Sequence, residues 1–140
     1  MPVEVETRNV AGKVTAIGPA GPFTLIVDRP VESGGGGRGF NGGQLLFLAV
    51  AGCISNDLFR EAATRSISLD RVVVRVVGDF QGDPATSTDI RYDVELSGHA
   101  TAKQLRELVQ HVDQIAEIPN SLRHGTAVRL ADASIVALDS

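Results

Sequence analysis

Residues 41–60 read Asn-Gly-Gly-Gln-Leu-Leu-Phe-Leu-Ala-Val-Ala-Gly-Cys-Ile-Ser-Asn-Asp-Leu-Phe-Arg, and this stretch decides the fold. It opens a helix that we predict over residues 44–65 and that is apolar on every side as far as Ala51. A helix without a polar face has to be buried all round. Cys53, the only cysteine of the chain, lies where the apolar half of this helix gives way to a polar half.

Strands and a second helix are predicted on both sides of this central helix. The predicted strands are one or two within residues 3–17, then 23–27, 69–80, 89–96 and 127–138. Thr101 and Gln104 predict a capping box that begins a second, amphipathic helix. Most neighbouring strands are joined by short turns, which predicts an antiparallel sheet in an α+β fold.

The length, net charge and composition of the chain limit the kinds of protein it can be. A length of 140 residues without repeats predicts one domain over 1–140, and the net charge of -4 argues against nucleic acid as a main partner. The longest uncharged apolar run, Leu45–Ile54, is about half the length that crosses a bilayer, so we expect no membrane partner. The single cysteine and an acidic amino end without an apolar signal core predict a cytoplasmic location.

Cys53 is the candidate catalytic residue. Helical spacing places Leu46 and Val50 beside it on one side and Asp57 and Arg60 on the other. A thiol peroxidase needs this combination, an apolar pocket for the substrate and a nearby cation that favours the thiolate. The competing interpretation is that Cys53 is a packing residue, because free cysteines are among the most buried side chains.

The segment of Asn41, Gln44 and Cys53 with its apolar filling resembles the central cysteine helix of the OsmC/Ohr family. Members are small, mostly bacterial proteins, many of them thiol-dependent hydroperoxide reductases active against oxidative stress. The resemblance implies an intertwined homodimer in which the cysteine helices pack centrally and the sites lie at the subunit interface. It follows the chain in element order, and in residues it is specific around 41–60 and, loosely, 116–125.

Two positions depart from the family pattern. There the helix opens as Asn-Pro-Glu, and a second cysteine follows the second helix as Cys-Pro-Val-Ser or similar. Here Gly43 stands where the Glu is expected, and we place Ala116 at the second cysteine. The Glu of the family helps an arginine from the amino-terminal strands to hold the reactive site. In this chain the candidates for that cation are Arg8, Lys13 and Arg38.

Two functions are compatible with these departures. In the first, Cys53 is the nucleophile of a one-Cys reductase of organic hydroperoxides, with an external thiol as reductant; the two-Cys cycle within one chain is excluded. In the second, the chain is a non-catalytic binding module that keeps an apolar ligand pocket at the dimer interface. An open pocket with an arginine or lysine beside Cys53 favours the first, and a sealed apolar cavity favours the second.

The remaining motifs are weak. Gly34–Gly39 satisfies G-x-G-x-x-G, but Phe40 to Gly43 separate it from the helix, so we interpret it as a flexible loop that could close over Cys53 rather than as a dinucleotide site. The histidines at 99, 111 and 124 lack the spacing of metal ligands, and His111 falls on the polar side of the second helix, where we expect it to be solvated. We predict neither cofactor nor metal.

Overall fold

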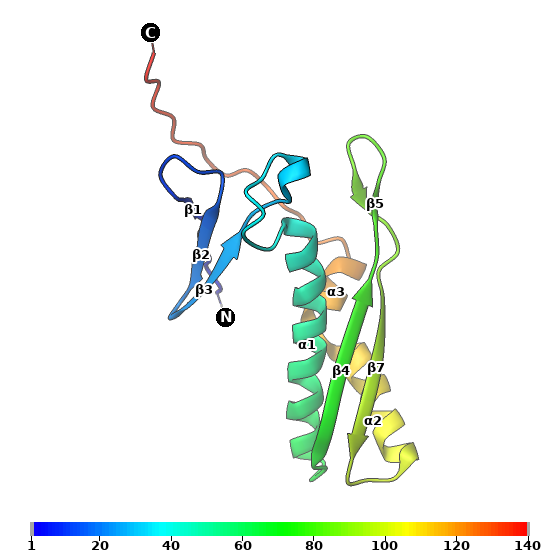
Figure 1. Ribbon diagram of the computed structural model, residues 1–140. Coiled ribbons are helices and arrows are strands. Elements are labelled where there is room, and N and C mark those ends of the chain that lie inside the picture. Colours follow the sequence, from blue (N-terminus) through cyan, green and yellow to red (C-terminus); the bar gives the residue numbers. More distant parts are fainter. Residues whose placement is uncertain (1, 140) are drawn as a thin grey trace.

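The computed structural model describes residues 2–139 and shows an α+β arrangement around one long helix (Figure 1). The helices are α1 (Gly42–Thr64), α2 (Ala102–Ile115) and α3 (Glu117–Arg123), with a short 3-10 helix at Val31–Ser33. The strands are β1 (Arg8–Asn9), β2 (Ala16–Ala20), β3 (Phe23–Val27), β4 (Leu69–Val77), β5 (Phe80–Gln81), β6 (Thr86–Ser87) and β7 (Arg91–Gly98). They form the antiparallel sheets β1-β2-β3, β4-β7 and β5-β6, which confirms the predicted fold class.

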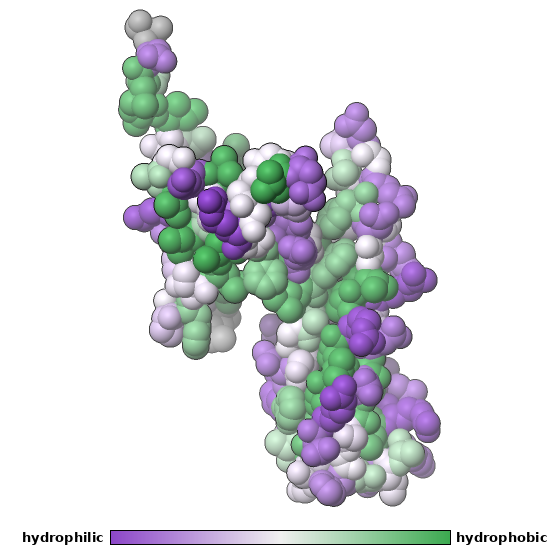
Figure 2. All heavy atoms as spheres, viewed as in Figure 1, coloured by the Kyte–Doolittle hydropathy of each residue, from purple (hydrophilic) through white to green (hydrophobic). Residues whose placement is uncertain are grey.

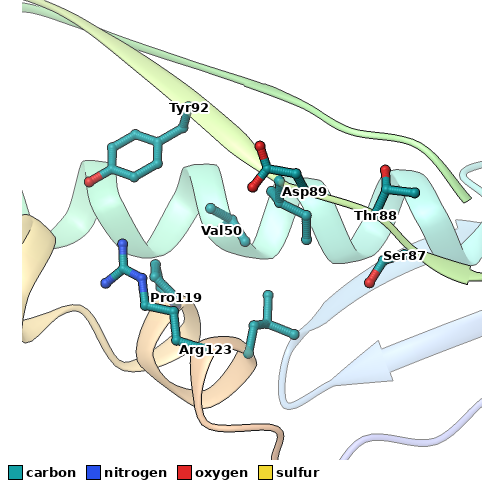
Figure 3. A pocket seen from close by; sticks show the side chains of 9 residues that line it. Val50, Ser87, Thr88, Asp89, Tyr92, Pro119 and Arg123 are labelled. Carbon is teal, nitrogen blue, oxygen red and sulfur yellow. The ribbon is translucent and has the colours of Figure 1, made fainter.

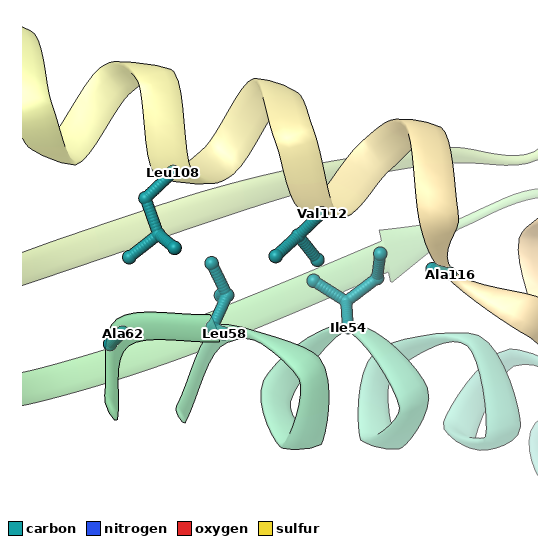
Figure 4. Close-up of a cluster of buried hydrophobic side chains, with 6 residues drawn as sticks. All are labelled: Ile54, Leu58, Ala62, Leu108, Val112 and Ala116. Carbon is teal, nitrogen blue, oxygen red and sulfur yellow. The ribbon is translucent and has the colours of Figure 1, made fainter. Parts of the chain in front are cut away.

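The core lies between α1 and α2, against one face of the β4–β7 hairpin. Figure 4 shows the interlocking side chains, which are Ile54, Leu58 and Ala62 of α1 and Leu108, Val112 and Ala116 at and after α2. On β7, Tyr92, Val94 and Leu96 face this cluster while Arg91, Asp93 and Glu95 are exposed. The predicted alternation along β7 is therefore confirmed, and its wet face points away from the helices.

Capping explains where both long helices begin. The Asn41 side chain accepts the backbone N–H of Gln44 at 2.9 Å, and the Gln44 side chain accepts the N–H of Asn41 at 3.0 Å. This capping box starts α1 at Gly42, two residues before the predicted position. Thr101 and Gln104 form the predicted capping box of α2. In both helices the side chains satisfy backbone donors that the first turn would leave unpaired.

The predicted strand over residues 127–138 is wrong for the single protomer. The segment is extended, but none of its described residues pairs in a sheet, and Val128, Leu130 and Leu138 are 95%, 87% and 93% exposed. A β-rich sequence becomes a strand only when another strand offers its backbone groups, and no sheet edge of this protomer does so.

Apolar surface is also exposed elsewhere. Figure 2 shows apolar residues over the surface of the β1–β3 sheet, where Ile17, Phe23 and Leu25 are at least two-fifths exposed. Helix α1 is long and apolar enough to cross a membrane by length and composition, with 22% of its most apolar window buried. Length and composition alone do not identify a membrane span, because the core helix of a soluble protein meets the same two criteria.

Candidate functional site

Cys53 is half-buried on the flank of α1, where it packs against the core cluster. Among the described residues, the Cys53 thiol takes part in no hydrogen bond. On the following turn Asp57 is buried, and its carboxylate pairs with the Arg60 guanidinium at 3.2 Å. Arg60 also approaches Glu61 at 3.6 Å, so its charge is directed to two carboxylates. Cys53 thus lies at the border of apolar and polar surface that the helical spacing predicted.

The three candidate cations all belong to the β1–β3 unit or to the loop that follows it. Arg8 pairs with Glu6 at 3.2 Å, Lys13 is exposed between β1 and β2, and the backbone N–H of Arg38 bonds to Asp28. Figure 1 shows this part of the chain at the amino end of α1. Cys53 lies eleven residues after Gly42, about 16 Å along the helix axis. In the described residues, none of the three side chains forms a hydrogen bond or ion pair with α1.

An aromatic pair occupies the space at Gly43. The rings of Phe47 and Phe80 stack with centroids 5.7 Å apart and an interplanar angle of 11°. A Cβ atom at Gly43 would lie 2.8 Å from the Phe80 ring, and one at Gly78 would lie 2.8 Å from the Phe47 ring. Each ring therefore rests on a glycine backbone. These aromatic rings line an apolar hollow of about 350 Å³ at the first turn of α1, in the place where the family pattern expects a carboxylate.

The segment after α2 is the part of the chain that corresponds to the second cysteine of the family. Ala116 caps both α2 and α3 and is completely buried in the core. In the motif Cys-Pro-Val-Ser the proline directly follows the cysteine, and here Pro119 directly follows Ile118. An alignment on the proline places half-buried Ile118 at the second cysteine, two residues after the predicted Ala116. The chemical consequence is unchanged, because Cys53 is the only cysteine of the chain.

The glycine-rich loop before α1 is fixed at two points by hydrogen bonds to one carboxylate. The buried Asp28 carboxylate accepts the Thr15 hydroxyl at 2.8 Å and the backbone N–H groups of Arg29, Gly36 and Arg38 at 2.8, 2.9 and 3.2 Å. These hydrogen bonds, led by the one from Gly36, lower the Asp28 pKa to about 2. The loop packs at the amino end of α1, so it does not lie over Cys53 of the same protomer.

A cavity of about 420 Å³ lies between α1, the start of β7 and α3 (Figure 3). Its walls combine apolar side chains with Tyr92 and Arg123. The Tyr92 hydroxyl donates to the Asp113 carboxylate, and Arg123 pairs with the same carboxylate at 2.7 Å. Burial, followed by the bond to Asp113, raises the Tyr92 pKa, and the Tyr92 hydrogen bond holds the Asp113 pKa below its ordinary value. Sequence reasoning missed this cluster because its members are 21 and 10 residues apart.

His111 is less solvated than predicted. Its Nε2 atom lies 3.6 Å from a Glu61 carboxylate oxygen, and 38% of its side chain is exposed. The Arg65 hydrogen bond and the charges around Glu61 lower the Glu61 pKa. Within residues 2–139, no three His, Cys, Asp or Glu side chains are grouped in a way that could hold a metal ion.

The model of the family described as OsmC-like protein matches residues 34–131. An OsmC-like protein from Mycoplasma pneumoniae is similar in structure, with a TM-score of 0.76, 16% identity and 88% of each chain covered. The organic hydroperoxide resistance protein OsmC from Legionella pneumophila gives a TM-score of 0.59 and 18% identity over 88% of this chain and 90% of that chain. A Vibrio cholerae protein described as a putative organic hydroperoxide resistance protein, with captopril bound in one of its active sites, gives a TM-score of 0.58 and 22% identity over 86% of this chain and 84% of that chain. No curated protein matches.

Proposed function

The chain belongs to the OsmC-like protein family, and from this premise we propose that it is a one-Cys thiol-dependent reductase of organic hydroperoxides. The observation that carries the proposal is Cys53, a partly accessible thiol at the middle of the central helix, beside apolar surface that suits an organic substrate. Two structural neighbours that share the fold with this chain are described as an organic hydroperoxide resistance protein and a putative one.

The reaction has two stages. The Cys53 thiolate attacks the distal oxygen of the hydroperoxide ROOH, the O–O bond breaks, and the alkoxide takes up a proton to leave as the alcohol. Cys53 becomes a sulfenic acid. An external thiol then forms a mixed disulfide with it and releases water, and a second external thiol frees Cys53 as the thiol and leaves as a disulfide. Each cycle thus oxidises two external thiols, since the chain holds no second cysteine. Such a cycle suits a reducing, cytoplasmic compartment, where we place the protein.

The site lacks the carboxylate that helps to activate the reactive cysteine in the family pattern. The carboxylate that would position an arginine is absent at Gly43, and the Phe80 ring covers that position. Removal of one positioned group from a catalytic set costs roughly 10² to 10⁴ in rate. We therefore expect slow turnover, and weaker turnover with dithiol reductants than two-Cys members of the family show.

Sulfenic acid trapping tests the chemistry directly. The protein is exposed to cumene hydroperoxide in the presence of dimedone, and adduct formation at Cys53 is followed by mass spectrometry together with release of cumyl alcohol. The expected result is one adduct per chain and one alcohol per adduct, both absent in Cys53→Ser. An unmodified Cys53 after prolonged exposure to excess hydroperoxide contradicts the proposal.

We also propose that the protein is a homodimer. The extended segment over residues 126–139 and the β1–β3 sheet expose apolar side chains that a single protomer leaves uncovered. In the first half of α1, Leu48 is 49% exposed, and a Cβ atom at Gly52 would meet nothing within 4 Å. A partner that packs its own strands and α1 against these surfaces would bury them and give the 127–138 segment the strand partner that it lacks.

The second candidate function is a non-catalytic binding module with an apolar pocket. The observation that favours it is the Phe47–Phe80 pair, which replaces the expected carboxylate by an aromatic wall. The trapping experiment separates the two functions, because a binding module would take up an apolar molecule without forming a sulfenic acid at Cys53.

A further inference from the structure

The cavity between α1, β7 and α3 has two chemically different walls. Its apolar wall consists of Val50 of α1, Ile90 before β7, and Pro119 and Leu122 of α3. Its polar wall includes the Arg123 guanidinium. A volume of about 420 Å³ lies within the range of small-molecule sites. A molecule with an apolar body and one polar end therefore matches the cavity better than a wholly polar one.

The hydrogen bonds of Arg123 fix its orientation and leave one edge free. Its Nη1 atom donates to the Asp113 carbonyl at 2.8 Å and to the Asn120 side chain at 3.0 Å, and its Nη2 atom donates to the Asp113 carboxylate at 2.7 Å. A guanidinium has five N–H donors, so three are used and two remain, at Nε and Nη2. An arginine can bind a carboxylate through both oxygens with one Nε and one Nη2 donor, and the Tyr92 hydroxyl lies beside this guanidinium.

We propose that this cavity binds a small amphipathic monocarboxylate, with its carboxylate on the free edge of Arg123 and its apolar body against Val50, Ile90 and Leu122. Tyr92 and Asn120 act as positioning residues. The Tyr92 hydroxyl donates a hydrogen bond to the Asp113 carboxylate, and the Asn120 side-chain oxygen accepts one from the Arg123 guanidinium. Binding of a carboxylate does not require Cys53 to react, so the inference is independent of the peroxidase proposal.

The charges around the cavity favour a monoanion over a dianion. Asp113 already balances part of the Arg123 charge, so a phosphate ester would meet net repulsion. Asp89 also lines the cavity. Asp89 and Arg123 are both exposed, so water and salt screen both charges. The polar wall thus offers one fork for one carboxylate.

Titration calorimetry on the 140-residue chain with Cys53→Ser tests the inference without any redox chemistry. The probes are sodium octanoate, the neutral isosteric octanamide and octyl phosphate. Octanoate is expected to bind at least about tenfold more tightly than octanamide, because a charge-assisted pair of hydrogen bonds contributes that much or more. Octyl phosphate is expected to bind more weakly than octanoate. Equal affinities for octanoate and octanamide, or tighter binding of octyl phosphate, would overturn the assignment.

Two arginine variants locate the site. Arg123→Gln is expected to weaken octanoate binding about tenfold and to leave octanamide binding unchanged. Arg106→Gln, which removes an exposed arginine from α2, serves as the matched control and should change neither affinity. Methyl NMR of the protein with native Arg123 provides a readout that does not depend on folding of the variant: octanoate should shift the Val50, Ile90 and Leu122 methyl signals. Shifts confined to other methyl groups refute the cavity as the site.

Discussion

Restoring a carboxylate at position 43 is predicted to conflict with Phe80. In Gly43→Glu the new Cβ atom lies 2.8 Å from the Phe80 ring, which must retreat by about 0.7 Å to reach ordinary contact at 3.5 Å. That retreat disturbs the stack with Phe47, and such aromatic pairs contribute about 0.5–1.5 kcal/mol beyond their buried area. In a Phe80→Ala background no ring stands in the way. We therefore expect Gly43→Glu to cost about 1 kcal/mol less there than in the natural sequence.

Urea unfolding of the four proteins in this double-mutant cycle measures the coupling. Helix propensity and the interaction of the new carboxylate with the helix dipole are common to both backgrounds, so they cancel in the difference. Gly42→Glu is the matched control, because a Cβ atom at Gly42 meets nothing within 4 Å. Its coupling with Phe80→Ala is expected to lie within about 0.3 kcal/mol of zero.

Two results would refute this reasoning. The first is a coupling between positions 43 and 80 that is no larger than the control coupling, which would mean that the Phe80 ring yields without cost. The second is a coupling of opposite sign, with Gly43→Glu tolerated better beside the intact ring. If the coupling is found, Gly43→Glu with Phe80→Ala is the background in which a gain of hydroperoxide turnover should be sought.

Three further predictions concern the assembly, the thiol and the loop. Light scattering at micromolar concentration should give twice the chain mass of 14.7 kDa, and a particle of 14.7 kDa contradicts the dimer. A bulky maleimide should label Cys53 much more slowly in the native protein than in urea, because the thiol is half-buried; equal rates would count against its placement. The folded Asp28 pKa of about 2 lies below the ordinary 3.8, so its stabilisation is present above about pH 4 and is lost as the pH falls through 2. Asp28→Asn should therefore lower the thermal midpoint at pH 7 and flatten its pH dependence between 4 and 2; a midpoint unchanged at pH 7 would show that the loop does not need Asp28.

Local signals predicted the long elements. The capping boxes at Asn41 and Thr101, the alternation of β7 and the apolar face of α2 depend on residues within a few positions of one another, and the structure confirms each of them. The short stretch around Cys53 was also enough to predict the family, and the match of the OsmC-like family model to residues 34–131 confirms that prediction.

Contacts between distant parts of the chain decided the rest. The Phe80 ring contacts Gly43, which lies 37 positions earlier in the sequence. The Asp28 carboxylate accepts hydrogen bonds from Thr15 and Arg38. Tyr92 and Arg123 both donate hydrogen bonds to the Asp113 carboxylate. The periodicity of the sequence does not predict such pairs, because the position of each side chain depends on how its helix, strand or loop packs against the others. The 127–138 segment also shows that local sequence alone does not decide whether a strand forms. Its residues favour a strand, but backbone hydrogen bonds need a partner edge, and whether one exists is decided by tertiary or quaternary structure rather than by the segment itself.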